Sequence, residues 1–217
     1  MILDERMLAF IRSMDKGNSL FLTELEQEAR SEEIPIIRPD MQSLLRFLTT
    51  LTKPVSILEV GTAVGFSAIL MAEHTPADCR ITTIENYEKR IPKALKNFKA
   101  AGYEEKITLL AGDAAKILPT LTGPYDLIFM DAAKGQYIHF LPEVKRLLSA
   151  GGLLISDNIM QDGEILESRF AVERRNRTIH SRMREYLFAL THDETFETVI
   201  LPVGDGVTLS VKKGVFL

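Results

Sequence analysis

The sequence predicts an α/β fold built on a doubly wound, mostly parallel sheet, and three observations lead to this prediction. From Pro54 onward, short apolar runs alternate with segments of helical periodicity, which is typical of parallel strands covered by helices on both faces. The runs are short and bounded by polar or glycine residues, as buried strands are. Two final runs are joined by Pro202–Gly206, whose glycines indicate a hairpin turn and hence an antiparallel strand at the end of the sheet.

The first 53 residues precede this alternation, and we expect them to form an N-terminal helical cap. A first helix is indicated by apolar residues at helical spacing, namely Leu3, Met7, Phe10, Ile11 and Met14. A second helix should run through about Leu20 to Glu32, where Pro35 and Pro39 then disfavour helix. A third should carry the apolar positions from Met41 to Leu51. Residues 54–217 should form the sheet-bearing domain, packed with the cap as one compact unit.

Seven strands are expected in the second part of the chain. They are Val55–Val60, Ile81–Glu85, Ile107–Ala111, Asp126–Asp131, Leu153–Asp157, Phe196–Leu201 and Val207–Val211. The expected helices between them are Ser67–His74, Lys89–Ala101, Ala114–Leu121, Tyr137–Leu148 and a long helix over about Ser168 to Thr191.

Composition narrows the class of protein. A chain of 217 residues that is 46% hydrophobic and 26% charged fits one ordinary globular unit. No apolar run is long enough to cross a membrane, and the N-terminus lacks the pattern of a signal peptide, so we expect a cytoplasmic protein without membrane association. The single cysteine, Cys79, excludes an internal disulfide framework. A net charge of −4 gives no global attraction to nucleic acid.

Two apolar runs are each followed directly by oxygen-bearing side chains. Asp131 follows residues 125–130, and Asp157 and Asn158 follow residues 152–156. Since open α/β folds bind ligands at the carboxyl ends of their strands, these groups should meet there and suit Mg²⁺ or another hard divalent cation. Lys134, three residues after Asp131, is a possible base. The alternative interpretation is an ordinary turn and cap pair beside a surface lysine.

Three earlier strand ends suggest a nucleoside-binding site. Gly61 and Gly65 lie in the first strand-to-helix turn, but their spacing is not that of a dinucleotide fold. Glu85 ends the second strand, where an acidic residue can accept hydrogen bonds from ribose hydroxyls. Asp113 follows the third strand and could bind an adenine amino group. Glu85 and Asp113 could instead only cap helices.

The motifs resemble those of the metal-dependent class I S-adenosylmethionine O-methyltransferases, the family of the catechol and caffeoyl-CoA O-methyltransferases. The segments that carry the resemblance are Ile57–Ser67, Asp131–Tyr137, Asp157-Asn158 and Pro202–Gly206. Within the family, Asp131–Tyr137 and Pro202–Gly206 look most like the bacterial tRNA 5-hydroxyuridine methyltransferases. The resemblance implies a Rossmann-like methyltransferase sheet of seven strands and a homodimer.

The resemblance also implies a role for individual residues. Residues that would bind S-adenosylmethionine are Ile37, Glu59, Gly61, Ser67, Glu85, Asp113, Ala114 and Asp131. Glu59, Gly61 and Ser67 would line its methionine part. The metal ligands would be Asp131, Asp157 and Asn158, with Asp131 and Lys134 as catalytic residues and Lys134 as the base.

Such a site suits methyl transfer to a weakly nucleophilic hydroxyl. The cofactor supplies the methyl group, and a bound cation can lower the pKa of a hydroxyl that it coordinates. A substrate with two adjacent oxygens, such as a catechol or 5-hydroxyuridine, could chelate the cation. A lysine needs a lowered pKa to act as a base, or it can remain charged and stabilise the oxyanion. The sequence leaves both roles for Lys134 open.

The acceptor is the open part of this interpretation. Arg174, Arg177 and Arg184 would project from one face of the long helix and could bind the phosphates of tRNA, or form a solvated or dimer-contacting face. Phe66, Tyr137 and Phe140 could stack on a flat acceptor, although core packing is at least as strong an alternative for Phe140. Together with these residues, the resemblance to the tRNA 5-hydroxyuridine methyltransferases implies methylation of 5-hydroxyuridine in tRNA to 5-methoxyuridine. The alternatives are a small phenolic substrate of the catechol or caffeoyl-CoA type, and a non-catalytic nucleoside-binding protein.

Overall fold

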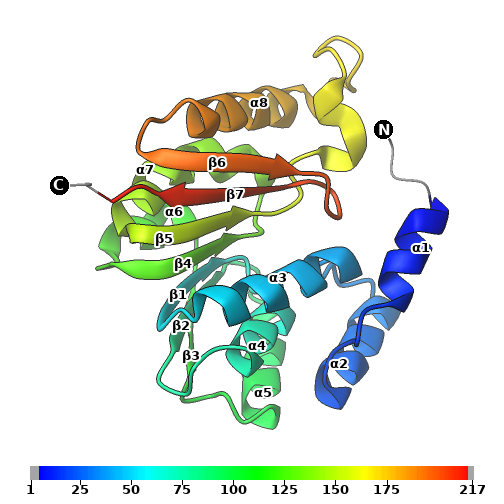
Figure 1. The fold of residues 1–217 in the computed structure, drawn as a ribbon, viewed down its shortest axis with the longest axis vertical. Coiled ribbons are helices and arrows are strands. Elements are labelled where there is room, and N and C mark those ends of the chain that lie inside the picture. The colour runs from blue at the N-terminus through cyan, green and yellow to red at the C-terminus, as the bar shows by residue number, and fades with distance from the viewer. Residues whose placement is uncertain (1–4, 215–217) are drawn as a thin grey trace.

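The computed structural model describes residues 5–214 and contains a seven-stranded sheet covered by helices on both faces (Figure 1). The strands are β1 Ser56–Val60, β2 Arg80–Glu85, β3 Ile107–Ala111, β4 Tyr125–Met130, β5 Leu148–Ser156, β6 Phe196–Leu201 and β7 Val207–Lys212. Their order is β3-β2-β1-β4-β5-β7-β6. Only β7 runs opposite to the other strands, so the predicted doubly wound, mostly parallel, Rossmann-like sheet is confirmed. The antiparallel strand lies inside β6 rather than at the edge.

The helices divide between the two faces of the sheet. They are α1 Glu5–Ser13, α2 Leu20–Ser31, α3 Pro39–Thr52, α4 Phe66–Glu73, α5 Ile91–Ala100, α6 Ala114–Ile117, α7 Tyr137–Leu147 and α8 Arg177–Thr191. Because side chains alternate along a strand, Ile57 packs in the core formed with α2 to α5, whereas Leu58 packs in the core formed with α6 to α8. No described helix is long and apolar enough to cross a membrane.

The N-terminal helices differ in how they pack. Leu22 on α2 and Met41 on α3 are fully buried in the same core as the sheet. Helix α1 buries none of its residues and stands to one side (Figure 1). Leu3, which the predicted first helix included, lies outside the described residues. The division into residues 1–53 and 54–217 stays a prediction.

The long helix predicted from Ser168 begins only at Arg177, and this part of the prediction was wrong. Residues 161–166 form a 3₁₀ segment interrupted by positive φ angles at Asp162 and Gly163. Beyond it, carbonyl groups that a helix would pair with backbone N–H groups are bound by side chains of α8 instead. His180 Nε2 lies 3.1 Å from the Glu167 oxygen, and Arg177 donates to the oxygens of Phe170 and Val172.

The helix predicted over Ala114–Leu121 is also shorter than expected. The α-helical part ends at Ile117, and a 3₁₀ turn, Leu118–Thr120, replaces the rest. Pro119 has no N–H to donate, so it cannot make the α-helical hydrogen bond at its own position.

Candidate active site

A cavity of about 540 Å³ opens at the carboxyl ends of β1 to β5, and it collects most of the predicted site residues. The predicted residues that line it are Ile37, Gly61, Ser67, Glu85, Asp113, Ala114, Asp131, Lys134 and Asn158. Residues 35–38, between α2 and α3, contribute another wall. The cavity therefore brings together predicted side chains from five strand ends and from the N-terminal region, while their roles stay a prediction.

The turn from β1 to α4 requires glycine for a steric reason. Gly61 has a φ of 106°, and a Cβ added there would lie 2.0 Å from the backbone oxygen of Asp131. The end of β4 approaches this closely because the Asp131 N–H donates to the Val60 oxygen at 3.0 Å. Gly61 thus allows the end of β1 and the end of β4, which carries Asp131, to meet.

The two acidic residues expected at the nucleoside line the cavity and also bind backbone groups. Glu85 accepts hydrogen bonds from the N–H of Ala63 at 2.7 Å and of Tyr87 at 2.8 Å. Asp113 is the N-cap of α6 and accepts from the Ala115 N–H at 2.9 Å. Capping is therefore one role of Asp113, as the alternative interpretation held. Each carboxylate still has acceptor sites that can face a ligand.

Glu59 differs from the prediction, because it is fully buried and does not line the cavity. Its carboxylate accepts hydrogen bonds from Ser67 Oγ and Thr83 Oγ1, each at 2.5 Å. Burial raises the pKa of Glu59 to about 7, and the negative charges of Asp131 and Glu85 act in the same direction. Glu59 therefore binds Ser67 from within the core, rather than facing the methionine part of a cofactor as expected.

The end of β4 and the end of β5 meet in a hydrogen-bonded cluster. Asp131 Oδ1 accepts from Lys134 Nζ at 2.9 Å and from Asn158 Nδ2 at 2.8 Å. Lys134 Nζ also lies 3.3 Å from the Asp157 backbone oxygen. Burial, and next the charge of Asp131, raise the pKa of the Asp157 carboxyl to about 7. Two carboxylates that repel each other in this way favour a nearby positive charge.

The donor set of this cluster fits a hard divalent cation. Residues 5–214 contain no group of three His, Cys, Asp or Glu side chains that could hold a metal, so the amide oxygen of Asn158 would be needed with Asp131 and Asp157. The orientation of an Asn amide is assigned from its hydrogen bonds, and rotation would exchange its nitrogen and oxygen. Metal ligation by these three residues stays a prediction.

The aromatic residues considered for the acceptor lie at different depths. Phe66 and Phe140 line the cavity. Tyr137 is fully buried, with its ring edge-on to Tyr186 and its hydroxyl 3.0 Å from the Met130 oxygen. Stacking of Tyr137 on an acceptor is therefore wrong for this structure. Its hydroxyl instead links the ends of β4 and β5, because it also lies 3.1 Å from the Asp157 oxygen.

The predicted arginine stripe on one helix is also wrong. Arg174 precedes α8, and Arg177 and Arg184 donate to backbone carbonyls in the segment before it. Sequence patterns also missed Arg38, which lines the cavity and forms an ion pair at 2.6 Å with Asp162. Those two residues are 124 positions apart, and no local signal relates them.

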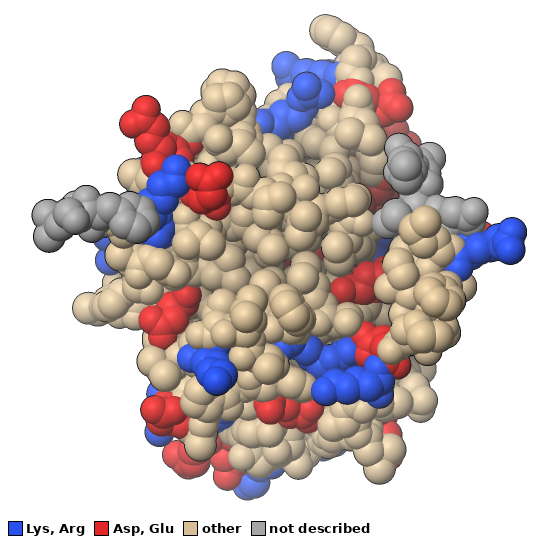
Figure 2. Space-filling model, in the orientation of Figure 1, with Lys and Arg blue, Asp and Glu red and all other residues tan. Residues whose placement is uncertain are grey.

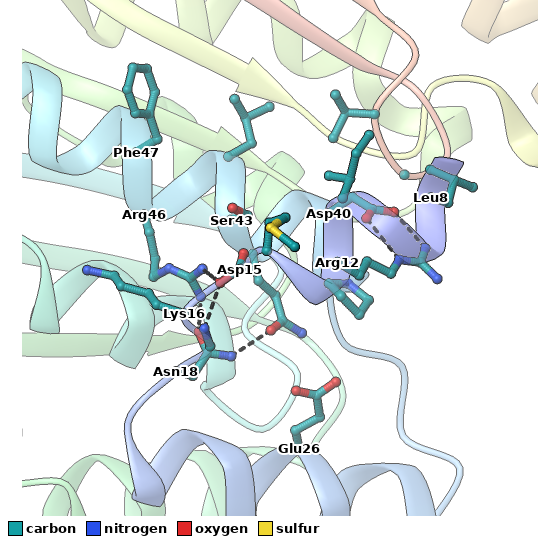
Figure 3. Close-up of a pocket in the computed structure, with 18 of the residues that line it drawn as sticks. Leu8, Arg12, Asp15, Lys16, Asn18, Glu26, Asp40, Ser43, Arg46 and Phe47 are labelled. Atoms are coloured by element: carbon teal, nitrogen blue, oxygen red, sulfur yellow. Dashed lines mark hydrogen bonds and ion pairs between the residues drawn. The ribbon is translucent and has the colours of Figure 1, made fainter. Parts of the chain in front are cut away.

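A larger cavity, of about 1000 Å³, lies among α1, α2, α3 and the β6–β7 turn (Figure 3). Its buried cation, Arg46, binds Asp15 and Asn18, and Arg12 donates to both oxygens of Asp40. These pairs join α1 and the residues after it to α3. The strand-end glycines and the acidic cluster lie in the smaller cavity, which is therefore the candidate active site.

Comparison with known proteins identifies the family of the chain. Residues 12–213 match the O-methyltransferase family. A catechol O-methyltransferase from Niastella koreensis is 36% identical over 135 residues, which span 60% of this chain and 61% of that relative. Caffeoyl-CoA O-methyltransferase 2 from Populus trichocarpa is 33% identical, with 78% of this chain and 72% of that protein aligned. The structure of an SAH-bound methyltransferase from Podospora anserina is similar at a TM-score of 0.87 and 28% identity, covering 97% of this chain and 95% of that chain.

Proposed function

Because the chain belongs to the O-methyltransferase family, we propose that it transfers the methyl group of S-adenosylmethionine to a hydroxyl at the carboxyl edge of its sheet. The observation that carries the proposal is the single cavity in which a glycine turn and two acidic strand ends adjoin the cluster of Asp131, Lys134 and Asn158. The SAH-bound relative from Podospora anserina supports the choice of cofactor.

The cofactor is proposed to lie along the strand ends. Gly61 lets the ends of β1 and β4 lie against each other beneath it, Glu85 accepts from the ribose, and Asp113 with Ala114 contacts the adenine. Ser67, held by Glu59, faces the methionine part. Ile37 covers it from the N-terminal side.

Magnesium or another divalent cation is the proposed second cofactor, held by Asp131, Asp157 and Asn158. It would supply positive charge that lowers the pKa of an acceptor hydroxyl. Lys134 is held beside these residues by its bond to Asp131. We assign Lys134 the removal of the hydroxyl proton, and its alternative role is to stabilise the oxyanion while remaining charged.

The proposed acceptor is 5-hydroxyuridine in tRNA, with 5-methoxyuridine as the product. The resemblance of Asp131–Tyr137 and Pro202–Gly206 to tRNA 5-hydroxyuridine methyltransferases supports it. A small phenol is the second candidate, and the names of the relatives from Niastella and Populus favour it.

Labelled S-adenosylmethionine distinguishes the two acceptors. Purified protein is incubated with magnesium and either tRNA that contains 5-hydroxyuridine or a catechol. The tRNA proposal predicts label in tRNA, in a nucleoside that co-migrates with 5-methoxyuridine after digestion. Label that enters catechol and never tRNA would refute the tRNA acceptor and favour the second candidate.

A cytoplasmic homodimer is the remaining part of the proposal. The exposed apolar side chains of Met7, Phe10, Ile11 and Met14 on and beside α1 support a contact with a second copy. The sedimentation coefficient measured over a range of concentrations tests it, and a monomer at every concentration would contradict it.

A further inference from the structure

Residues 166–175, from the last residue of the 3₁₀ turn toward α8, protrude from the edge of the molecule that holds the active site. This segment lies in the yellow part of the ribbon, at the end of α8 toward which β5 points (Figure 1). We call it the protruding segment. It starts eight residues after Asn158, and α8 behind it contacts the Lys134–Gln136 turn through a hydrogen bond from Arg182 to the Gly135 oxygen at 3.2 Å. The segment therefore leads into a helix that contacts the turn carrying Lys134, which lines the cavity.

The protruding segment exposes apolar side chains that the monomer does not use. Phe170 is 83% exposed and Leu166 is 77% exposed, the two highest values among the large hydrophobic residues described. Val172, in contrast, is 4% exposed and anchors the segment. An exposed phenyl ring held near a buried anchor is available to a partner with a flat face.

Two arginines accompany this ring without partners of their own. Arg169 and Arg174 are exposed, and neither has a hydrogen bond or an ion pair within residues 5–214. The neighbouring charges are mostly neutralised, because Glu173 pairs with Arg175 at 2.7 Å and Glu164 accepts from Asn176. Glu167 is the remaining acidic side chain of the segment. The blue atoms near the top of Figure 2, beside a tan projection, lie over this part of the ribbon.

The backbone of the protruding segment is held in place although it lacks helix and strand. Arg177 donates to the oxygens of Val172 and Phe170 at 3.1 and 3.2 Å, and Arg184 donates to the Ile165 oxygen at 3.3 Å. These arginines of α8 are thus positioning residues. They orient Phe170 and its flanking residues before any partner arrives, which reduces the entropy lost on binding.

We propose that the protruding segment docks the single-stranded RNA around the methylated nucleotide, with Phe170 stacking on a base and Arg169 and Arg174 binding phosphates. This inference rests on the proposed tRNA acceptor. The chemistry is that of single-stranded RNA recognition, in which aromatic rings stack on bases and guanidinium groups bind phosphate. A chain with a net charge of −4 needs such a local basic patch to attract RNA. When the target base enters the cavity, its neighbouring nucleotides remain outside, where the segment lies.

Fluorescence anisotropy with a labelled RNA hairpin whose loop carries uridine tests the inference across a salt titration. Phe170→Ala should weaken binding by roughly 5- to 150-fold through loss of one stacked base. Arg169→Glu with Arg174→Glu should weaken it about tenfold or more, and should reduce the slope of log Kd against log salt by about 1.4. The control is Lys96→Glu with Lys99→Glu on the exposed face of α5, which should change Kd less than about twofold because those charges are distant and screened.

Equal affinities of the segment variants and the control would overturn the inference, and so would a wild-type protein that does not bind the hairpin. Loss of binding to anionic phospholipid vesicles, with RNA binding unchanged, would also overturn it and would make the segment a membrane contact. The proposed function fails separately. If wild-type protein does not methylate tRNA but the segment variants lose hairpin binding, the acceptor is wrong and the docking inference stands. If tRNA is methylated and the variants bind the hairpin normally, the proposed acceptor stands and the docking inference is wrong.

Discussion

Replacing Glu59 by Gln should make the protein more stable at alkaline pH, and the structure gives the size of the effect. Glu59 is fully buried, and its pKa is raised from 4.5 to about 7, chiefly by burial. Below the lower value the carboxyl is protonated in both the folded and the unfolded protein. As pH rises toward the higher value, only the unfolded chain releases its proton, so stability is lost. Once pH exceeds the higher pKa, the free energy of unfolding has fallen by about 3 kcal/mol.

A glutamine at position 59 removes this titration and keeps the local hydrogen bonds. Its amide oxygen can accept from one of the two hydroxyls that contact Glu59, on Ser67 and Thr83, and its amide nitrogen can donate to the other. The difference in unfolding free energy between variant and wild type should therefore grow by about 2 to 3 kcal/mol between about pH 5 and pH 8, in favour of the variant.

Urea unfolding of both proteins at several pH values measures this difference. The contributions of the other titrating groups cancel, because both proteins share them. A difference that stays constant with pH would refute the assignment of a raised pKa to Glu59. S-adenosylmethionine affinity gives a second readout. Since Glu59 acts through Ser67, the variant should bind the cofactor within about tenfold of wild type.

Three further changes test other parts of the structure. Gly61→Ala should abolish cofactor binding, because its Cβ would overlap the Asp131 backbone oxygen. The control Gly151→Ala, also at positive φ but in open space, should cost only about 1 kcal/mol of stability. Calorimetric titration and thermal unfolding check both variants, and equal effects would contradict the steric argument. Lys134→Arg and Lys134→Met should both lower kcat by about 100-fold or more if Lys134 removes the proton; an arginine variant that keeps most activity would identify an electrostatic role instead. Arg46→Met should lower the free energy of unfolding by about 2 kcal/mol, since Arg46 is 7% exposed and binds Asp15 and Asn18. Arg12→Met, which removes an exposed ion pair, should lower it by less than about 1 kcal/mol. Urea unfolding gives both values, and similar losses would show that burial does not strengthen the contacts of Arg46.

Strand ends could be predicted from the sequence because each is a local pattern. An apolar run followed by Asp131, or by Asp157 and Asn158, shows both the strand and the side chains at its carboxyl end. Parallel strands then place these ends at one edge, so the structure brings the two groups together as expected. The glycine turn after β1 was visible for the same reason.

Features that depend on distant contacts could not be predicted. Arginine spacing alone suggested a helical stripe, but Arg177 and Arg184 bind carbonyls of a segment that departs from helix. The sequence also gave no sign that Glu59 would be covered by Ser67 and Thr83, or that Arg38 would meet Asp162. Each of these depends on how separate segments pack, which periodicity does not describe.

The dependence of methyl transfer on Asp157 and a divalent cation tests the central claim most directly. Initial rates are measured for wild type, Asp157→Ala and the exposed control Asp78→Ala, with magnesium or with chelator, and cofactor affinity is measured in parallel. We predict that chelator stops wild type and the control, and that Asp157→Ala loses about 100-fold or more in rate while its S-adenosylmethionine affinity stays within about threefold. Full activity of wild type in chelator, or of Asp157→Ala in magnesium, would contradict a metal-dependent methyl-transfer centre at this edge of the sheet.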